Sequence, residues 1–291
     1  MRYAPILFLA TAACGCATEN VSNEPLSPEL HECVPYTATS SSDTITGAYA
    51  VVNDQPIDSL TAPDDPGGGF FELVLTTDNA DLSPGFIVTA MGDESGAIIA
   101  STAAGSMDPT TMVGGFSAAP GQVYKIEFTA GQNAPADSYP IAFTLNWTFT
   151  GTMDCYEAND TADAARQVPV GTRIEAFSLA GFETNSLPAK PYDDWYKVVL
   201  NRAATIESEL ITPPGDHRMR IRFWEADGTT QLANAGGSAG GETFTASASL
   251  EAGTYLMSVE VGDADYAEFW ADREPPSFWR TPYTVDLREA P

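Results

Sequence analysis

Short segments of alternating apolar and polar residues follow one another through most of the chain beyond residue 33. Gly, Pro, Asp and Asn separate these segments, and such residues favour turns between strands. The clearest segments are 70–75, 85–91, 123–128, 141–147, 194–200, 220–224 and 255–261. Their close spacing predicts an all-β fold built as antiparallel β-sandwiches. Helical periodicity is nearly absent, although 161–167 could form one or two helical turns.

The pattern occurs twice, which indicates an internal repeat. Similar segments in the two halves are 92–101 with 225–234 and 119–128 with 251–260. Each half also has an Asp-Asp pair before an apolar segment, at 64–65 and at 193–194. We therefore expect two tandem jelly-roll-like sandwiches. The predicted organisation is a lipoprotein-type signal peptide at 1–16, a flexible linker at 17–32, and sandwiches at 33–151 and 152–291.

The second half carries several short motifs in a fixed order. They are E-A-N-D-T at 157–161, D-D-W-Y at 193–196, A-D-G at 226–228, G-T-Y at 253–255 and Y-T-V at 283–285. This order and spacing resemble the bacterial pre-peptidase C-terminal domain over residues 154–291. Residues 33–150 lack the Glu-x-Asn-Asp core, so this first half resembles a degenerate copy of the same domain.

The resemblance implies a fold and a class of function. Pre-peptidase C-terminal domains are eight-stranded sandwiches attached to secreted peptidases and other surface proteins. The family includes the collagen-binding modules of collagenases, and its domains have no catalytic role of their own. The resemblance therefore implies a secreted binding module.

The charge of the chain restricts its partners. The chain has 291 residues, with 40 acidic against 13 basic side chains and a formal net charge of −27. Nucleic-acid binding needs stripes of Lys and Arg, and the sequence has none. The same charge repels anionic membrane surfaces and favours divalent cations or basic partners. Apolar residues at 43% are enough for folded cores.

The first residues predict export. Arg2 precedes an apolar stretch at 3–13 that is too short to remain in a bilayer. The stretch leads into C-G-C, which resembles a bacterial lipobox, so Cys14 or Cys16 is the predicted lipidation site. We expect a lipid-anchored protein of the bacterial cell envelope that contacts the membrane through this anchor. Ordinary cleavage after residues 10–12 and release from the cell is the alternative.

The remaining cysteines predict a disulfide. If Cys16 is lipidated, Cys33 and Cys155 remain as an even pair outside the cytoplasm, where thiols oxidise. If Cys14 is lipidated, one cysteine is left over. A bridge between Cys33 and Cys155 would contribute about 4–5 kcal/mol in the chain-entropy model. The alternative is two thiols that are buried or paired separately.

Catalytic motifs are missing from the sequence. The chain has two histidines, and it has no nucleophile elbow, zinc-protease motif, P-loop or Cys-x-x-Cys. Pairs of carboxylates are frequent, as expected at this charge, so a glycosidase-like pair is the remaining enzymatic alternative. We expect a protein that is not an enzyme.

An insertion in the second half is rich in aromatic residues. Gly121 and Tyr139 are 18 residues apart, whereas the matching Gly253 and Tyr283 are 30 apart. The additional residues fall within 265–283, which we call the aromatic insertion. Aromatic and Arg side chains are enriched in binding hot spots. The predicted ligand-binding residues are Tyr266, Phe269, Trp270, Phe278, Trp279 and Arg280. The alternative is a lid that folds back on the sandwich.

Residues 154–160, which we call the acidic segment, suggest a metal site. Calcium takes six to eight oxygen ligands, from carboxylates, amides and backbone carbonyls. In calcium-binding members of the family, the Glu-x-Asn-Asp segment and the acidic pair before the aromatic strand share one ion. The resemblance therefore implies that Ca²⁺ is bound by Glu157, Asn159, Asp160, Asp193 and Asp194. The alternative is a helix cap by Asp160 or Thr161, with Asn159 in an Asx-turn.

These observations favour a non-catalytic, lipid-anchored surface protein that binds an extracellular protein or polysaccharide. Two alternatives remain at this point. One is a hydrolase that acts on polysaccharides through Asp/Glu pairs. The other is a structural spacer in an envelope complex.

Overall fold

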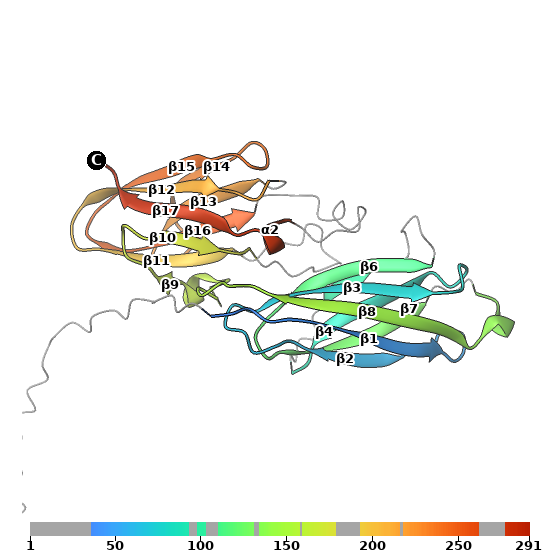
Figure 1. The fold of residues 1–291 in the computed structure, drawn as a ribbon. Coiled ribbons are helices and arrows are strands. Elements are labelled where there is room, and N and C mark those ends of the chain that lie inside the picture. Colours follow the sequence, from blue (N-terminus) through green and yellow to red (C-terminus); the bar gives the residue numbers. More distant parts are fainter. Residues whose placement is uncertain are drawn as a thin grey trace, which may run out of the picture.

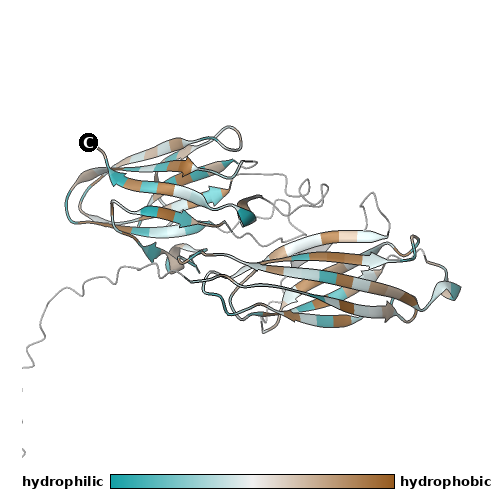
Figure 2. Ribbon diagram, viewed as in Figure 1, coloured by the Kyte–Doolittle hydropathy of each residue, from teal (hydrophilic) through white to brown (hydrophobic). Residues whose placement is uncertain are grey.

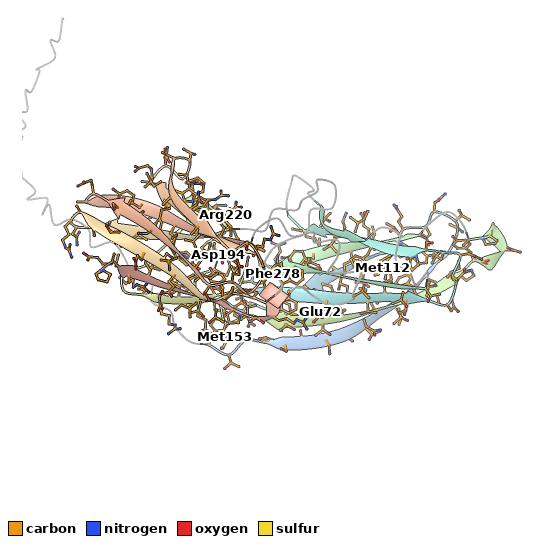
Figure 3. All side chains as sticks on the ribbon, turned by 90° about the horizontal axis from the view of Figure 1, so that it is seen from above. Glu72, Met112, Met153, Asp194, Arg220 and Phe278 are labelled. Carbon is orange, nitrogen blue, oxygen red and sulfur yellow. The ribbon has the colours of Figure 1, made fainter. Side chains whose placement is uncertain are left out.

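The computed structural model places most of the described residues in strands (Figure 1). The structure describes residues 36–92, 98–102, 110–130, 134–157, 159–178, 193–215, 218–261 and 277–291. Its sheets form two β-sandwiches that lie one after the other along the molecule (Figures 1 and 3). The predicted all-β sandwich fold is therefore confirmed. No helix among the described residues is long and apolar enough to cross a membrane.

The first sandwich contains eight strands. They are β1 (Ser40–Tyr49), β2 (Ile57–Thr61), β3 (Gly69–Thr77), β4 (Pro84–Ala90), β5 (Ile98–Thr102), β6 (Thr111–Ala118), β7 (Val123–Ala130) and β8 (Ile141–Gly151), with a short 3-10 helix, η1 (Ala136–Ser138), before β8. One sheet has the order β1-β8-β3-β6 and the other β2-β7-β4-β5. All the pairs are antiparallel. This order is that of a jelly roll.

The second sandwich repeats this topology. Its elements are η2 (Ala162–Ala164), β9 (Arg166–Gln167), β10 (Arg173–Ala176), β11 (Asp194–Leu200), β12 (Ala204–Thr212), β13 (Met219–Glu225), β14 (Gln231–Gly236), β15 (Phe244–Leu250), β16 (Gly253–Val261), α2 (Ser277–Arg280) and β17 (Tyr283–Glu289). Its sheets are β10-β17-β12-β15 and β14-β13-β16-β11-β9. If β10 is matched with β1 and β11 with β2, the remaining strands correspond in order. The short strand β9 is an addition, paired in parallel with β11.

The topology corrects one detail of the predicted repeat. The Asp pair at 193–194 lies at the start of β11, the counterpart of β2, whereas the pair at 64–65 precedes β3, the counterpart of β12. The two pairs are therefore not equivalent, although each precedes an apolar segment. The similar segments 119–128 and 251–260 do fall on matching strands, β7 and β16.

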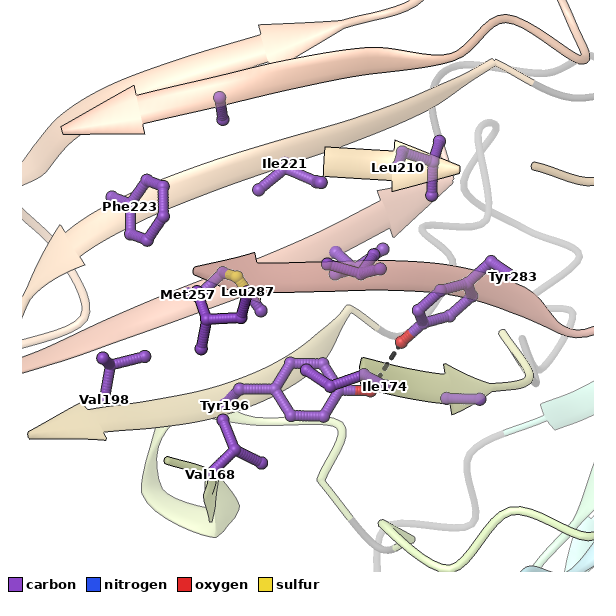
Figure 4. Packing of buried hydrophobic residues seen from close by; sticks show 14 of the residues in the cluster. Val168, Ile174, Tyr196, Val198, Leu210, Ile221, Phe223, Met257, Tyr283 and Leu287 are labelled. Atoms are coloured by element: carbon purple, nitrogen blue, oxygen red, sulfur yellow. Dashed lines mark hydrogen bonds between the residues drawn. The ribbon is translucent and has the colours of Figure 1, made fainter. Parts of the chain in front are cut away.

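Each sandwich has a core made by the inward-facing residues of its strands. On β3, Phe71, Leu73 and Leu75 are fully buried, and the residues between them are half-buried. The alternation is visible as changing hydropathy along the strands (Figure 2). In the second core, Tyr196, Phe223 and neighbouring aliphatic side chains pack between the two sheets (Figure 4). Full burial of such a side chain contributes about 1.5–3 kcal/mol.

Candidate metal centre

Three carboxylates from two distant segments meet at one edge of the second sandwich. Glu157 and Asp160 come from the acidic segment, and Asp194 is the first residue of β11. One oxygen atom of each lies within 4.8 Å of the others. The backbone N–H of Trp195 donates to the carbonyl of Asn159 at 2.8 Å, which holds the acidic segment against β11. Three of the five predicted ligands therefore converge.

The acidic segment is held in shape by two charged residues that bind its backbone. Arg166 on β9 donates from Nε to the carbonyl of Tyr156 at 2.9 Å and from Nη2 to that of Glu157 at 2.8 Å. Asp154 accepts from the N–H of Tyr156 at 2.9 Å and from the N–H of Phe177 at 2.7 Å. Asp154 is 1% exposed, so it is a buried scaffold of the segment. Sequence reasoning did not assign these roles, because both depend on backbone groups that the fold brings near.

Asp194 is buried, and its two carboxylate oxygens have different surroundings. Its Oδ2 accepts a hydrogen bond of 2.5 Å from the hydroxyl of Tyr283, at the start of β17. The Tyr283 hydroxyl also lies 2.6 Å from that of Tyr196 (Figure 4). The other oxygen, Oδ1, is buried and has no hydrogen-bond partner in the described part of the chain. Because Tyr283 fixes one oxygen, the other remains available at the carboxylate cluster.

Buried oxygens without hydrogen-bond partners are concentrated at this site. Besides Asp194 Oδ1, they include Glu157 Oε1 and Asn159 Oδ1. The amide nitrogen of Asn159 donates to the carbonyl of Trp195 at 3.4 Å, which leaves its oxygen as a possible ligand. A buried acceptor without a donor costs about 1–3 kcal/mol. A bound cation would satisfy all three oxygens, so these residues fit a metal ion.

The electrostatics of the cluster agree with this fit. Burial raises the pKa of Asp154 and of Asp160 to about 6. Burial, together with the charges of Asp160 and Asp154, raises the pKa of Glu157 well above its usual value. Burial and the charge of Glu157 do the same to the pKa of Asp194. The carboxylates therefore lie in an environment that disfavours negative charge unless a counter-ion is present.

Two further predictions for this region concern Asp193 as a ligand and the capping of η2. Asp193 is half-buried and is not one of the three converging carboxylates. The capping alternative is wrong for Thr161, which precedes η2 but makes no hydrogen bond from its side chain to the helix. Asp160 is not the cap of η2 either, since Thr161 occupies the N-cap position and no side chain caps the helix there.

The structure corrects part of the prediction for the aromatic insertion. Tyr266, Phe269 and Trp270 lie outside the described residues. Phe278 and Trp279 on α2 are fully buried, so the predicted binding role is wrong for these two. The Trp279 ring packs on Phe70 of β3 with centroids 5.5 Å apart, and Figure 3 shows Phe278 where the two sandwiches meet. Both rings cover apolar surface that would otherwise face water. Arg280 is exposed.

The predicted lipidation and disulfide sites are mostly outside the described part of the chain. Cys14, Cys16 and Cys33 all lie before residue 36. Cys155 is half-buried and packs against the core of the second sandwich. Lipidation and the bridge therefore stay predictions.

Comparisons with known proteins add little to this picture. No family model matches the chain, and no curated protein matches it. Among solved structures, tripeptidyl peptidase 2 is 9% identical with a TM-score of 0.29, over 90% of this chain and 24% of that one. The PBSX exported protein XepA is 11% identical with a TM-score of 0.27, over 76% and 86% of the two chains. The CUB1-EGF-CUB2 domains of rat MASP-1 are 10% identical with a TM-score of 0.23, over 85% and 97%.

Scores this low carry no argument about fold or function. This chain spans about a quarter of the length of tripeptidyl peptidase 2. The resemblance to the pre-peptidase C-terminal domain stays a prediction.

Proposed function

We propose that this chain is a non-catalytic extracellular binding protein whose second sandwich is stabilised by a structural Ca²⁺ ion. One observation carries the proposal: carboxylate oxygens of Glu157, Asp160 and Asp194 converge within 4.8 Å, and buried oxygens there have no hydrogen-bond partner. Bound Ca²⁺ would add positive charge beside that of Arg166, which lowers the pKa of Glu157 by less than burial and the neighbouring carboxylates raise it.

The ligand atoms favour Ca²⁺ over other biological cations. The converging group among the described residues is made of three carboxylates, and the neighbouring Asn159 has a buried amide oxygen. Zinc prefers nitrogen and sulfur ligands, and Mg²⁺ requires nearly ideal octahedral geometry. Ca²⁺ accepts six to eight oxygens in variable geometry, including backbone carbonyls and water. An irregular set of this kind suits Ca²⁺.

The same geometry argues against a polysaccharide hydrolase at this site. The carboxyl pairs of glycosidases are separated by about 5–5.5 Å or about 6.5–9.5 Å and must flank a bound sugar. Here the oxygens of three carboxylates lie within 4.8 Å, and Asp194 is 1% exposed. A sugar ring has no room between them. We therefore assign the cluster to metal binding.

A surface on the first sandwich supports the proposed binding role. The outward positions of the sheet β1-β8-β3-β6 form what we call the hydroxyl face. Its polar members are Ser40, Ser42, Thr44, Thr46, Thr76, Thr111, Ser117, Thr144, Asn146, Thr148 and Thr150. Among the described outward positions of these strands, Glu72 is the single charged residue.

The matching sheet of the second sandwich provides a contrast. Its outward positions carry Arg173, Glu175, Glu207, Glu209, Asp286 and Arg288. The two sheets share a topology within one strongly acidic chain, so chain composition does not explain their difference. A face of donors and acceptors with Glu72 as its single described charge suits an extracellular protein or polysaccharide, which it can contact while desolvating few ionic groups.

The proposal includes the location of the protein. A lipid on Cys14 or Cys16 would anchor the chain to the bacterial envelope, at the outer membrane or cell surface, with residues 17–32 as a tether. A Cys33–Cys155 bridge would link the starts of the two sandwiches. Mass spectrometry of the N-terminal peptide tests the anchor, and an unmodified N-terminus beginning at residue 13 in the culture medium would contradict it.

Titration calorimetry and thermal unfolding of the metal-stripped protein test the calcium site. We expect one bound Ca²⁺ and a higher melting temperature, since a ligand that binds the folded state at a hundredfold excess over its Kd stabilises by about 2.7 kcal/mol. Asp194→Asn should abolish both effects. Asp286→Asn, on the outer face of the opposite sheet, is the matched control and should retain them. An absence of Ca²⁺ binding by the unmodified protein would overturn the proposed site.

A further inference from the structure

The two sandwiches meet through a close backbone contact. A Cβ built on Gly67 would lie 2.8 Å from the backbone nitrogen of Asp154, so a side chain is excluded there. Thr152 donates from Oγ1 to the carbonyl of Gly67 at 2.8 Å and from its N–H to the carbonyl of Gly68 at 3.1 Å. The hydroxyl of Tyr36 accepts from the N–H of Gly67 at 2.8 Å and donates to the carbonyl of Thr152. The loop before β3 is thus tied to the start of the second sandwich.

A second contact joins the sandwiches through side chains. Phe70, although on β3 of the first sandwich, belongs to the hydrophobic core of the second. Its ring packs on Trp279 of α2, which is fully buried. We call these two contacts together the junction: the backbone contact of Gly67 and Gly68 with Thr152 and Asp154, and the ring contact of Phe70 with Trp279.

Both contacts are made by segments that also build the carboxylate cluster. The backbone of Asp154 abuts Gly67, while its side chain binds the backbone of Tyr156 and so shapes the acidic segment. On the other side, Trp279 packs on Phe70, and four residues later Tyr283 donates to Asp194. The cluster therefore shares a short segment with each of the two contacts.

We propose that a cation in the carboxylate cluster controls how firmly the two sandwiches are joined. With the ion bound, the acidic segment and the start of β17 are drawn together, which holds Asp154 against Gly67 and Trp279 against Phe70. Without it, buried carboxylates repel one another, and the segments that carry both contacts loosen. The metal thus makes one rigid unit of two sandwiches. This inference rests on the proposed metal site.

Hydrogen exchange of the full chain, with Ca²⁺ or with chelator, tests the inference. Removing Ca²⁺ should speed amide exchange at Gly67 and Thr152 by about tenfold or more, since their donors are released when the junction opens locally. Exchange at β4 and β7, within the first sandwich, should not change. Asp160→Asn should give the chelator pattern whether or not Ca²⁺ is present.

A second variant separates the junction from the site. Phe70→Ala removes the ring contact and leaves every proposed metal ligand in place. It should still bind Ca²⁺ by calorimetry, but the effect of Ca²⁺ on exchange at Gly67 should shrink several-fold. Small-angle scattering should show this variant and the chelated protein to be more extended than the Ca²⁺-loaded protein.

The outcomes distinguish the two proposals. If calorimetry detects Ca²⁺ and exchange slows in the acidic segment but not at Gly67 or Thr152, the metal site stands and the control of the junction is wrong. If the unmodified chain binds no Ca²⁺, both proposals fail. Equal scattering profiles with and without Ca²⁺ would also count against the junction.

Discussion

At the scale of single residues, the function of Asp194 depends on the different surroundings of its two oxygens. Tyr283 donates to one, and the other is buried without a hydrogen-bond partner among the described residues. Tyrosine is neutral at physiological pH, so it orients the carboxylate without supplying the missing positive charge. Asp154 has a different role, because its oxygens are occupied by backbone N–H groups. Burial and hydrogen bonding thus separate a proposed ligand from a scaffold residue among chemically identical side chains.

The Tyr283 hydroxyl gives a first prediction. Tyr283→Phe removes the donor to Asp194 and keeps the ring in the core. We expect the Ca²⁺ affinity to fall about 10- to 100-fold, as for other groups that orient metal ligands. Titration calorimetry measures the change. Tyr255→Phe is the control. Its hydroxyl donates to the carbonyl of Glu251 at 3.3 Å, and neither residue belongs to the carboxylate cluster. Unchanged affinity in Tyr283→Phe would contradict the orienting role.

The buried carboxyls predict how stability varies with pH. Asp154 and Asp160 have pKa values of about 6 when folded, above the value of about 3.9 in unfolded chains. Groups with a raised folded pKa stabilise the protein fully below the unfolded pKa, and this contribution is lost as pH rises through the folded value. The metal-free protein should therefore lose stability between about pH 4 and pH 7.

Calcium should change this dependence, because it binds the ionised carboxylates. The increase in melting temperature caused by Ca²⁺ should be larger at pH 8 than at pH 5, where protons compete for the same oxygens. Differential scanning calorimetry at both pH values, with Ca²⁺ and with chelator, measures the effect. Asp160→Asn should reduce the loss of stability at high pH in chelator. An equal Ca²⁺ effect at both pH values would disagree with the assignment.

At the scale of elements, two small elements of the second sandwich support the proposed site. Strand β9 pairs in parallel with β11 and carries Arg166, which binds the acidic segment. Helix α2 lies just before β17 and places Trp279 against Phe70. Strand β9 has no counterpart in the described strand order of the first sandwich, and at the position that matches α2 the first sandwich has the short helix η1. Strand β9, with Arg166, therefore distinguishes the sandwich with the proposed metal site from its repeat.

The packing of α2 gives a prediction about stability. Trp279→Ala should destabilise the second sandwich by about 3–5 kcal/mol, since a buried large ring is removed and a cavity is left. Arg280→Ala, at the next and exposed position, should change stability by about 0.5 kcal/mol or less. Urea denaturation of both variants measures the difference. A small effect of Trp279→Ala would mean that the ring is not part of the core in solution.

At the scale of the whole molecule, one topology is used twice with different surfaces. The charged outer sheet of the second sandwich contains ion pairs such as Arg288 with Glu207 at 3.1 Å and Arg173 with Asp286 at 3.6 Å. The corresponding sheet of the first sandwich presents the hydroxyl face. The halves thus divide two tasks under the proposed function: the first contacts a partner, and the second holds the metal and the junction.

The hydroxyl face gives a prediction about binding. Thr44→Glu with Thr148→Glu places two charges on exposed positions of adjacent strands. We expect this pair to abolish binding of the soluble protein on an array of neutral polysaccharides and extracellular matrix proteins, because the added charges must be desolvated. Ser247→Glu, exposed on the matching sheet of the second sandwich, should bind normally. Equal binding by both variants would remove this face from the proposal.

The sequence by itself determined the all-β class and the position of most strands. The reason is local. Side chains alternate across a strand with a period of two, so the buried positions can be predicted from the order of apolar and polar residues. The repeat was recognisable for the same reason on β7 and β16. Glu157, Asp160 and Asp194 could be named as candidate ligands, but the expectation that they lie close together came from a family resemblance.

Tertiary structure alone decided the rest. The two Asp pairs stand before or at the start of strands that are not equivalent. Only the sheet order shows this, because sequence spacing does not specify which strands pair. Asp154, Arg166 and Tyr283 acquired roles through backbone and hydroxyl groups from distant strands, and such hydrogen bonds leave no periodic signal. Phe278 and Trp279 look the same in sequence whether they bind a ligand or fill a core. Packing against Phe70 settled the question, because burial of apolar surface depends on which elements the fold brings together.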